Sequence, residues 1–316
     1  MMGRLRAVVS LVLGLACVVV VGTATAASQA ADALPGRLLF VKDGDLWVWD
    51  AALGAHPLAT GGTFSQPSWG PDGSSLAYVY RGTNFADIFV TDDQGQSQTR
   101  LTTSQSTILD NNDWNLRPTW SPDGSLIAYV SDHSSALPLL WLMNPDGSGR
   151  HVLSTPGLQP EAIDAIAWAP DGSQLAVTVY SEPGPTQVAL IPLGATNRQV
   201  GHVLTELAGG ALDPTWAPDG SWLAFAGREG YAVEVYAERP DGSGLQKLTN
   251  DGLLARAPAW SPDGRHLAYL LNRGGAFEIW TVDVQADTSG GLVASAPRQL
   301  TQDLHVDAAS GLSWGH

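Results

Sequence analysis

The chain has 316 residues and a hydrophobic fraction of 44%, enough for a sizeable core, which excludes an intrinsically disordered chain. Its 16 basic and 31 acidic residues give a formal net charge of −15. This balance argues against nucleic acid and anionic membrane surfaces as partners. Cys17 is the single cysteine, so a disulfide framework and a cysteine-based zinc site are excluded.

Residues 1–26 have the three parts of a secretory signal peptide. Arg4 and Arg6 supply a positive start, residues 7–21 form an uncharged apolar run, and Ala24-Thr25-Ala26 supplies an A-x-A cleavage site. The alternative is an uncleaved membrane anchor, because the apolar run with the residues that follow it is just long enough to span a bilayer. We therefore expect a periplasmic or secreted protein, with membrane contact only through this segment if it is retained.

A repeated Trp-x-Pro-Asp-Gly unit dominates the chain after residue 36. Residues 27–36 are expected to be a short linker, and residues 37–316 one domain built from this repeat. Five complete copies and one truncated copy follow each other at spacings of 44 to 54 residues, a period typical of propellers and solenoids. The copies begin at Trp69, Trp120, Trp168, Trp216, Trp260 and, truncated, Trp314.

Each copy predicts a tight turn followed by strands. Proline presets φ at the first central position, aspartate suits the second, and glycine takes the left-handed conformation that closes a hairpin. Two apolar runs and a short fourth strand follow, which gives four antiparallel strands per repeat. Runs such as Leu76–Val79 and Ile88–Val90 are apolar throughout, as expected of sheets covered on both faces. Blades stacked in a ring provide this cover, so the sequence predicts an all-β propeller.

The two ends of the domain predict the number of blades. Residues 38–59 have the pattern of strands two, three and four with no strand one before them, while a lone strand one lies around Trp314. Pairing this C-terminal strand with the three N-terminal strands would close a six-bladed ring and remove exposed sheet edges.

The repeat resembles that of the TolB-type β-propeller family, whose WD-like unit is Trp-Ser-Pro-Asp-Gly. The resemblance covers nearly all of the chain after the signal peptide, and spacing, turn residues and strand order agree in five copies. It implies a six-bladed propeller that acts by binding proteins in the cell envelope. TolB itself carries an α/β domain before its propeller, which has no counterpart in residues 27–36.

Residues just before each repeat tryptophan enter the innermost strand and should therefore surround the central channel. We expect a partner-binding site at the channel mouth on the face opposite the Pro-Asp-Gly turns, where the loops are longer and do not repeat. The candidates come from residues 110–117, residues 303–307 and single positions between them; they are Trp114, Arg117, Asp164, Asp213, Arg256 and Asp307.

Other motifs have simpler structural interpretations. The repeat aspartates are explained by their turns, and the repeat tryptophans by packing between inner strands. Residues 110–113 (Asp-Asn-Asn-Asp) could offer oxygen ligands to calcium but lack the spacing of a calcium loop. Residues 311–315 match the G-x-S-x-G nucleophile pattern, yet Ser313 belongs to the sixth repeat rather than to a strand-to-helix elbow, so we interpret the match as a false positive.

These observations favour an exported, monomeric, non-catalytic scaffold that binds a protein or peptide and needs no cofactor or metal. The alternative is a propeller enzyme, a lyase or glycan-processing hydrolase, with a metal or carboxylates at the channel mouth.

Overall fold

The computed structural model describes residues 34–316 except 105–111, 134, 136, 159–161, 181–183 and 195–199. The expected signal peptide and most of the linker therefore lie outside the described residues, as does Asp110. Residues Leu34–His316 form one unit, and the description below concerns this unit. Among its described residues the regular structure consists of β-strands, which confirms the predicted all-β class.

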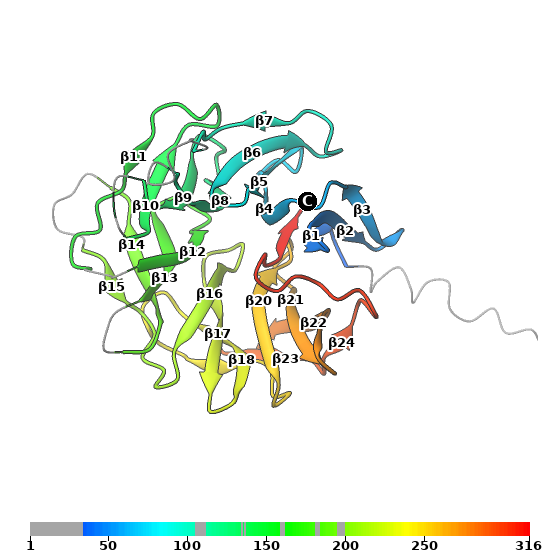
Figure 1. The fold of residues 1–316 in the computed structure, drawn as a ribbon. Helices are drawn as coiled ribbons and strands as arrows, with labels where there is room; N and C mark the ends of the chain where they lie inside the picture. The colour runs from blue at the N-terminus through cyan, green and yellow to red at the C-terminus, as the bar shows by residue number, and fades with distance from the viewer. Residues whose placement is uncertain are drawn as a thin grey trace, which may run out of the picture. The chain divides into compact units, whose positions relative to one another are not determined.

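Four-stranded antiparallel sheets follow one another around a central channel (Figure 1). Blade 1 has the order β25-β1-β2-β3 and contains β1 (Arg37–Lys42), β2 (Asp45–Asp50), β3 (Gly54–Ala59) and β25 (Ser313–Gly315). Blade 2 contains β4 (Phe64–Trp69), β5 (Ser75–Arg81), β6 (Ala86–Asp92) and β7 (Thr99–Arg100). Blade 3 contains β8 (Asn115–Trp120), β9 (Ile127–Ser131), β10 (Leu139–Met143) and β11 (His151–Val152).

The remaining strands form blades 4, 5 and 6. Blade 4 contains β12 (Ala162–Trp168), β13 (Gln174–Tyr180), β14 (Gln187–Pro192) and β15 (His202–Val203). Blade 5 contains β16 (Ala211–Trp216), β17 (Leu223–Glu229), β18 (Ala232–Glu238) and β19 (Gln246–Lys247). Blade 6 contains β20 (Leu254–Trp260), β21 (His266–Arg273), β22 (Ala276–Ala286), β23 (Leu292–Ala294) and β24 (Arg298–Gln299). One parallel pair, Val233 with Leu254, joins blades 5 and 6 into a single 9-stranded sheet.

The Pro-Asp-Gly segments form the predicted turns. In the first copy the Gly73 N–H donates to Gly70 O at 3.0 Å, and the Asp72 carboxylate accepts the Ser74 N–H at 3.0 Å. The glycines of the five copies have φ between 67° and 72°, a left-handed conformation that costs glycine little. Because the carboxylates hold the backbone after each turn, the structural interpretation of the repeat aspartates is confirmed.

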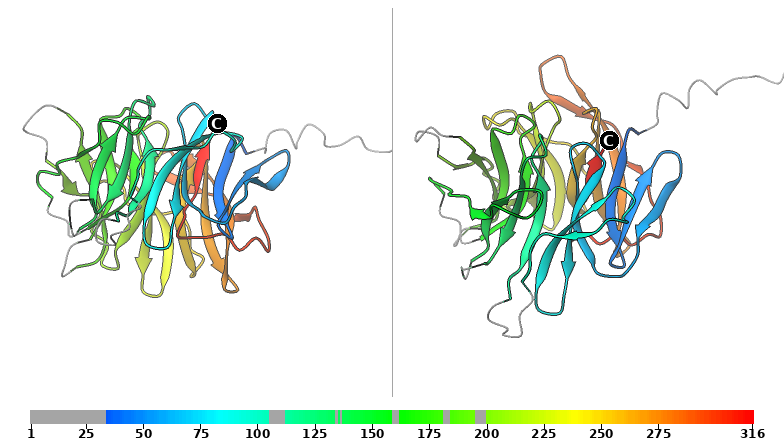
Figure 2. Two further views of the ribbon diagram at one scale, coloured as in Figure 1. Left: turned by 45° about the horizontal axis from the view of Figure 1, so that its top comes forward. Right: turned by 90° about the horizontal axis from the view of Figure 1, so that it is seen from above.

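The strand β25 joins the end of the chain to its beginning. Leu38 pairs with Trp314, and Leu39 pairs with Ser313. In Figure 1 this red strand lies beside the blue β1. The pairing agrees with the predicted closure, and the grouping of the described strands is consistent with six blades. The β22–β23 hairpin is an addition that the repeat did not predict, and it projects from the sheets (Figure 2, right).

Buried polar side chains hold the connections between blades. The Glu278 carboxylate, at the start of the third strand of blade 6, accepts the Thr301 Oγ1–H at 2.6 Å and the Leu304 N–H at 2.8 Å. The neutral Gln187 accepts the Thr205 Oγ1–H at 2.8 Å in blade 4. The same arrangement joins Thr102 to Asp87 and Thr249 to Glu234. In blades 2, 4, 5 and 6 these contacts hold the segment that follows the fourth strand against the start of the third.

Candidate functional site

The innermost strands of five blades carry a backbone irregularity. In blades 2, 3, 5 and 6 their pairing shifts register between the fourth and the first residue before the repeat tryptophan, for example between Leu116 and Thr119 in β8. In blade 4 the shift lies one residue earlier, between Ile163 and Ile166. The residue within this shift has a positive φ at Gln66 (49°), Arg117 (56°) and Asp213 (54°), and proline follows each of them. A left-handed residue before proline is strained, at a cost of about 1–3 kcal/mol, and such strain often marks functional sites.

These irregular positions line a central cavity of about 450 Å³. Gln66, Arg117 and Asp213 contribute to it, and the turn prolines, such as Pro122 and Pro170, line it as well. The cavity therefore runs from the Pro-Asp-Gly turns down to the irregular positions. The expected binding face lies opposite these turns, and the cavity also reaches the repeating face, since the turn prolines line it.

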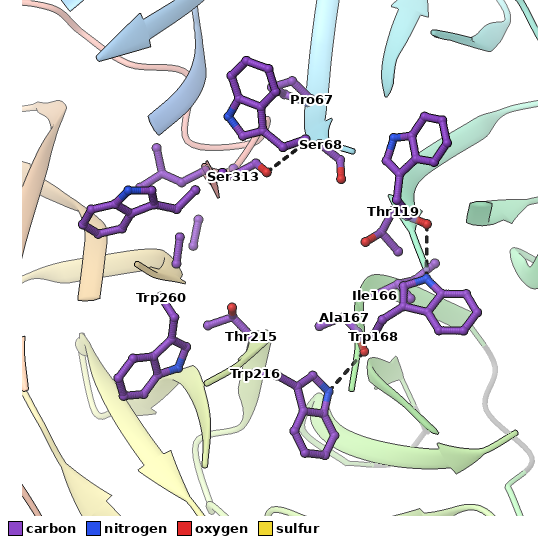
Figure 3. Close-up of a pocket in the computed structure, with 18 of the residues that line it drawn as sticks. Pro67, Ser68, Thr119, Ile166, Ala167, Trp168, Thr215, Trp216, Trp260 and Ser313 are labelled. Carbon is purple, nitrogen blue, oxygen red and sulfur yellow. Dashed lines mark hydrogen bonds between the residues drawn. The ribbon is translucent and has the colours of Figure 1, made fainter. Parts of the chain in front are cut away.

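The tryptophans of the repeat pack between blades, around this cavity. Figure 3 shows Trp168, Trp216 and Trp260 with their indoles directed away from the centre of the channel. Trp168 Nε1–H donates to Thr119 O at 3.2 Å, and Trp216 Nε1–H donates to Ala167 O at 3.2 Å, each across the blade boundary. This arrangement confirms the packing role predicted for the repeat tryptophans.

Four of the six candidate residues form ion pairs at the inner end of the cavity. Arg117 Nε donates to Asp164 Oδ1 at 2.7 Å, and its Nη2 donates to Oδ2 at 3.4 Å. Arg256 Nε donates to Asp213 Oδ2 at 2.8 Å. Each pair joins two neighbouring blades, since Arg117, Asp164, Asp213 and Arg256 belong to β8, β12, β16 and β20. We call these four side chains the channel network.

The charges of the network act on one another across the channel. Burial alone would lower the pKa of Arg117, but Asp164 and Asp213 outweigh it and raise this pKa above its ordinary value. Burial and then the Asp164 carboxylate raise the pKa of Tyr180, whose hydroxyl lies 3.5 Å from Asp164 Oδ2. The guanidinium of Arg117 is therefore permanently charged at the inner end of the cavity.

One donor of Arg117 remains free for a ligand. Its Nε and Nη2 bind Asp164, whereas its Nη1 makes no hydrogen bond to the described residues and lies 4.0 Å from where a Cβ would stand on Gly311. The side chain therefore reaches toward the wall formed by blade 1. A guanidinium donor in this position can bind a carbonyl or carboxylate oxygen.

Two further residues join this site although we did not expect them there. Gln66 Oε1 accepts the Arg117 N–H at 2.9 Å, and Tyr180 contacts Asp164. Gln66 stands at the same repeat position as Arg117 and Asp213, three residues before its tryptophan, so aligning the copies could have found it. Tyr180 ends the neighbouring strand β13 and carries no comparable sequence signal.

The other two candidates lie elsewhere and make no hydrogen bond or ion pair with the channel network among the described residues. Trp114 forms a bridge with Ala86, and the Arg81 guanidinium lies 6.0 Å from its ring. The Asp307 carboxylate accepts the Ala309 N–H at 3.0 Å and the Ser310 Oγ–H at 2.8 Å, which places it in a turn. The structure thus divides the six candidates into a connected group of four and two separate residues.

The remaining motifs have defined places. Asp110 and Asn111 of the possible calcium loop lie outside the described residues, while Asp113 pairs with His133 at 2.7 Å. Ser313 lies in β25, and its Oγ accepts the Trp69 N–H at 3.0 Å. It therefore stands in a strand of the sixth repeat, as expected, and not in a strand-to-helix elbow. Within the described ranges no three His, Cys, Asp or Glu side chains are grouped closely enough to hold a metal ion. Those ranges also hold no helical segment whose length and hydropathy would suit a bilayer crossing.

The family model described as "TolB beta propeller domain" matches residues 105–297, more than half of the chain. The chain belongs to this TolB propeller family. The TolB resemblance seen in the sequence is therefore confirmed, and the fold agrees with it.

The similarity to individual relatives covers only part of each relative. The "Uncharacterized peptidase YuxL" of Bacillus subtilis is 25% identical over 51% of this chain and 29% of its own length. The "Tol-Pal system protein TolB" of Anaeromyxobacter dehalogenans is 31% identical over 34% of this chain and 23% of its own length. The crystal structure of TolB from Acinetobacter baumannii superposes with a TM-score of 0.69 at 19% identity, covering 92% of this chain and 70% of that one. The chain thus spans less than a third of the two curated relatives, and the solved structure supports the fold.

Proposed function

We propose that the chain is an exported, non-catalytic scaffold that binds an extended segment of a protein partner in its central channel. Residues 1–26 would direct export to the periplasm or the cell exterior, residues 27–36 would form a linker, and residues 37–316 would bind the partner as a monomer. The family assignment and the similarity to a protein of the Tol-Pal system support this proposal.

The observation that carries the proposal is the cavity with Arg117 at its inner end. A volume of about 450 Å³ is in the range of ligand-binding pockets, roughly 300–1,000 Å³. The free Nη1 of Arg117 can donate to a backbone carbonyl or a carboxylate of the segment, while the two ion pairs hold the network in place. Strain at Gln66, Arg117 and Asp213 agrees with a binding role, because the folded chain maintains it at a cost.

The test is photo-crosslinking from the channel wall in the producing cell. A benzophenone side chain at Ala165, which lines the cavity, should form an adduct with a protein partner, and the same group at the outer residue Val203 should not. Adding Arg117→Ala should reduce the Ala165 adduct about tenfold, because a charged hydrogen bond is worth about 1.5–3 kcal/mol. Trp114→Ala is the matched control and should leave the adduct unchanged. An adduct that persists in Arg117→Ala would remove the channel network from the binding site.

A propeller enzyme is the second candidate, and the similarity to a protein named as a peptidase favours it. Asp213 lines the cavity and Asp164 pairs with Arg117, which also lines it; each of these carboxylates is paired with an arginine. Metal analysis of the purified chain together with peptide and glycan hydrolysis assays separates the two functions. Turnover that Asp164→Asn or Asp213→Asn abolishes would replace the scaffold by an enzyme.

A further inference from the structure

A second cavity lies between blades 3 and 4, beside the mouth of the channel. It has a volume of about 510 Å³. Leu126 and Leu142 line it from blade 3, and Trp168 and Leu193 line it from blade 4. We call it the blade 3–4 groove. Its remaining lining comes from the turns, Ser121, Pro122, Asp123, Ser125, Pro170, Asp171 and Gly172.

Blade 5 shows one way in which the corresponding space is filled. Leu126 of blade 3 corresponds to Trp222 of blade 5, because Leu126 O accepts the Ser121 N–H at 2.9 Å and Trp222 O accepts the Ala217 N–H at 2.8 Å. The Trp222 side chain is buried and packs with Trp260 in one apolar cluster of blades 5 and 6. An indole therefore occupies between blades 5 and 6 the space that Leu126 leaves open between blades 3 and 4.

The opposite wall of the groove corresponds in the same way. Leu193 of blade 4 matches Val284 of blade 6, since the N–H of each donates to the residue after the repeat glycine, Ser173 or Arg265, at 2.7 Å. Val284 belongs to the cluster that contains Trp222. The two spaces are thus bounded by equivalent residues and differ in the side chain that enters them.

A cation accompanies the indole in blade 5. Arg239 Cζ lies 4.4 Å from the centroid of the Trp222 ring. The corresponding residue of blade 3 is Asn144, because both residues donate their N–H across the same turn at 2.9 Å, to Ser148 O in blade 3 and to Ser243 O in blade 5. Blade 3 therefore lacks both the aromatic ring and the positive charge that blade 5 supplies.

Two carboxylates at the groove favour a positive charge in its occupant. Hydrogen bonds from Ser121 and Ser125 lower the pKa of Asp123 to about 2, and those from Ser173 lower the pKa of Asp171. Both line the groove and are ionised at neutral pH. An aromatic side chain that brings a lysine or arginine with it would meet the apolar walls and these charges together.

We propose that the blade 3–4 groove binds an aromatic side chain of a protein partner, with a lysine or arginine next to it in the partner's sequence. The groove shares Pro122, Trp168 and Pro170 with the channel cavity, so one extended segment can occupy both. The inference rests on the proposed function only in taking a protein as the partner. A cavity of this size exceeds the roughly 150 Å³ that suffices to hold a benzene ring.

The probe for the test is the peptide acetyl-Lys-Trp-Arg-amide, with acetyl-Lys-Ala-Arg-amide and acetyl-Glu-Trp-Glu-amide as controls. Binding to the purified chain is followed by NMR through the indole N–H signal of Trp168. The alanine control should bind about tenfold more weakly, because burial of the ring is worth about 1.5–3 kcal/mol. The glutamate control should bind at least about threefold more weakly, because Asp123 and Asp171 repel it. Equal binding of all three peptides would overturn the proposal.

Leu126→Trp puts an indole into the blade 3–4 groove, as Trp222 does at the equivalent position of blade 5. It should raise Tm by about 2 °C or more by filling the cavity and should abolish the response of the probe. Leu245→Trp is the matched control, because Leu245 is exposed directly before β19, and it should retain binding. Probe binding that survives Leu126→Trp would place the peptide outside the groove.

Two further variants keep the test independent of folding and of the channel. Asp123→Asn and Asp171→Asn keep a side-chain oxygen that can accept the N–H of Ser125 or Ser173, so both variants should fold. Together they should weaken binding of the probe about threefold. Arg117→Ala should leave the probe response unchanged even if it removes partner binding in the channel. A probe that responds to Arg117→Ala and not to Leu126→Trp binds in the channel, which would sink this inference and leave the proposed function standing.

Discussion

At the scale of single residues, Glu238 differs from the other buried carboxylates. Glu234 and Glu278 each accept hydrogen bonds from a threonine and from backbone N–H groups. Glu238 is 6% exposed, and its Oε2 has no hydrogen-bond partner. Burial, and then the negative charges of Asp241 and Glu206, raise the pKa of Glu238 to about 7. Its ionised form is therefore disfavoured in the folded chain.

Glu238→Gln should consequently change the pH dependence of stability. The carboxyl has a pKa near 4.5 when unfolded and about 7 when folded, so its ionisation costs stability progressively as pH rises between these values. We expect the variant to gain roughly 1–2 kcal/mol at pH 8 and nothing at pH 4, because partial solvent access reduces the full effect of the shift. Chemical unfolding at both pH values measures this. Glu229→Gln, which removes an exposed partner of Lys247, should bring no gain at pH 8.

The residues of the channel network could be named from the sequence because the repeat fixes their position relative to a tryptophan. Arg117, Asp164, Asp213 and Arg256 all stand three or four residues before one. Which arginine pairs with which aspartate could not be predicted. The pairing depends on the register shift within the innermost strand, which changes the direction in which the side chains at the shift point. Trp114 lies before the shift, where the same rule no longer applies.

At the scale of the element, the third and fourth strands of a blade are joined by a threonine. Thr301 Oγ1–H donates to the Glu278 carboxylate at 2.6 Å, and the same oxygen accepts the Ile279 N–H at 2.9 Å. Thr205 does the same in blade 4, with the neutral Gln187 in place of the glutamate. The threonine recurs in the sequence and could be recognised there. Its partner could not, because the residue at the start of the third strand is aspartate, glutamine or glutamate depending on the blade.

Thr301→Val should destabilise the chain by about 2–3 kcal/mol. The variant removes a hydrogen bond to a buried charge and leaves the Ile279 N–H unsatisfied. Thr205→Val is the matched control: it likewise leaves a backbone N–H, that of Val188, unsatisfied, but it should cost about 1 kcal/mol less because its side-chain partner is neutral. Denaturant midpoints of the two variants give the comparison. Equal losses would mean that the charge of Glu278 does not strengthen the link.

At the scale of the whole unit, closure brings the backbone of both ends into close contact. A Cβ on Gly36 would lie 2.1 Å from Gly315 O, whereas a Cβ on Gly54 would have no neighbour within 4 Å. Both glycines have φ of 70°, so the backbone strain of an alanine is the same at the two positions. The ring of repeats could be predicted from the sequence. The cavities could not, because they depend on which side chain enters the space between two blades, as Leu126 and Trp222 illustrate.

Gly36→Ala should therefore destabilise the chain far more than Gly54→Ala. We expect a loss of about 3 kcal/mol or more for the first variant, because the closing strand has to move, and about 1–2 kcal/mol for the second from strain alone. Thermal unfolding of the two variants checks this. If both lose the same stability, β25 does not pack against Gly36 in solution.

The pairing of β1 with β25 also has a consequence for the order in which the chain folds. During synthesis β1 to β3 leave the ribosome long before β25, so the inner edge of β1 has no partner until nearly the whole chain has emerged. An unpaired edge of apolar residues such as Leu38 and Leu39 can pair with other chains. Contacts between residues this far apart in sequence also form slowly. The newly made chain should therefore be most prone to aggregation, and most in need of a chaperone, just before its final strand is available.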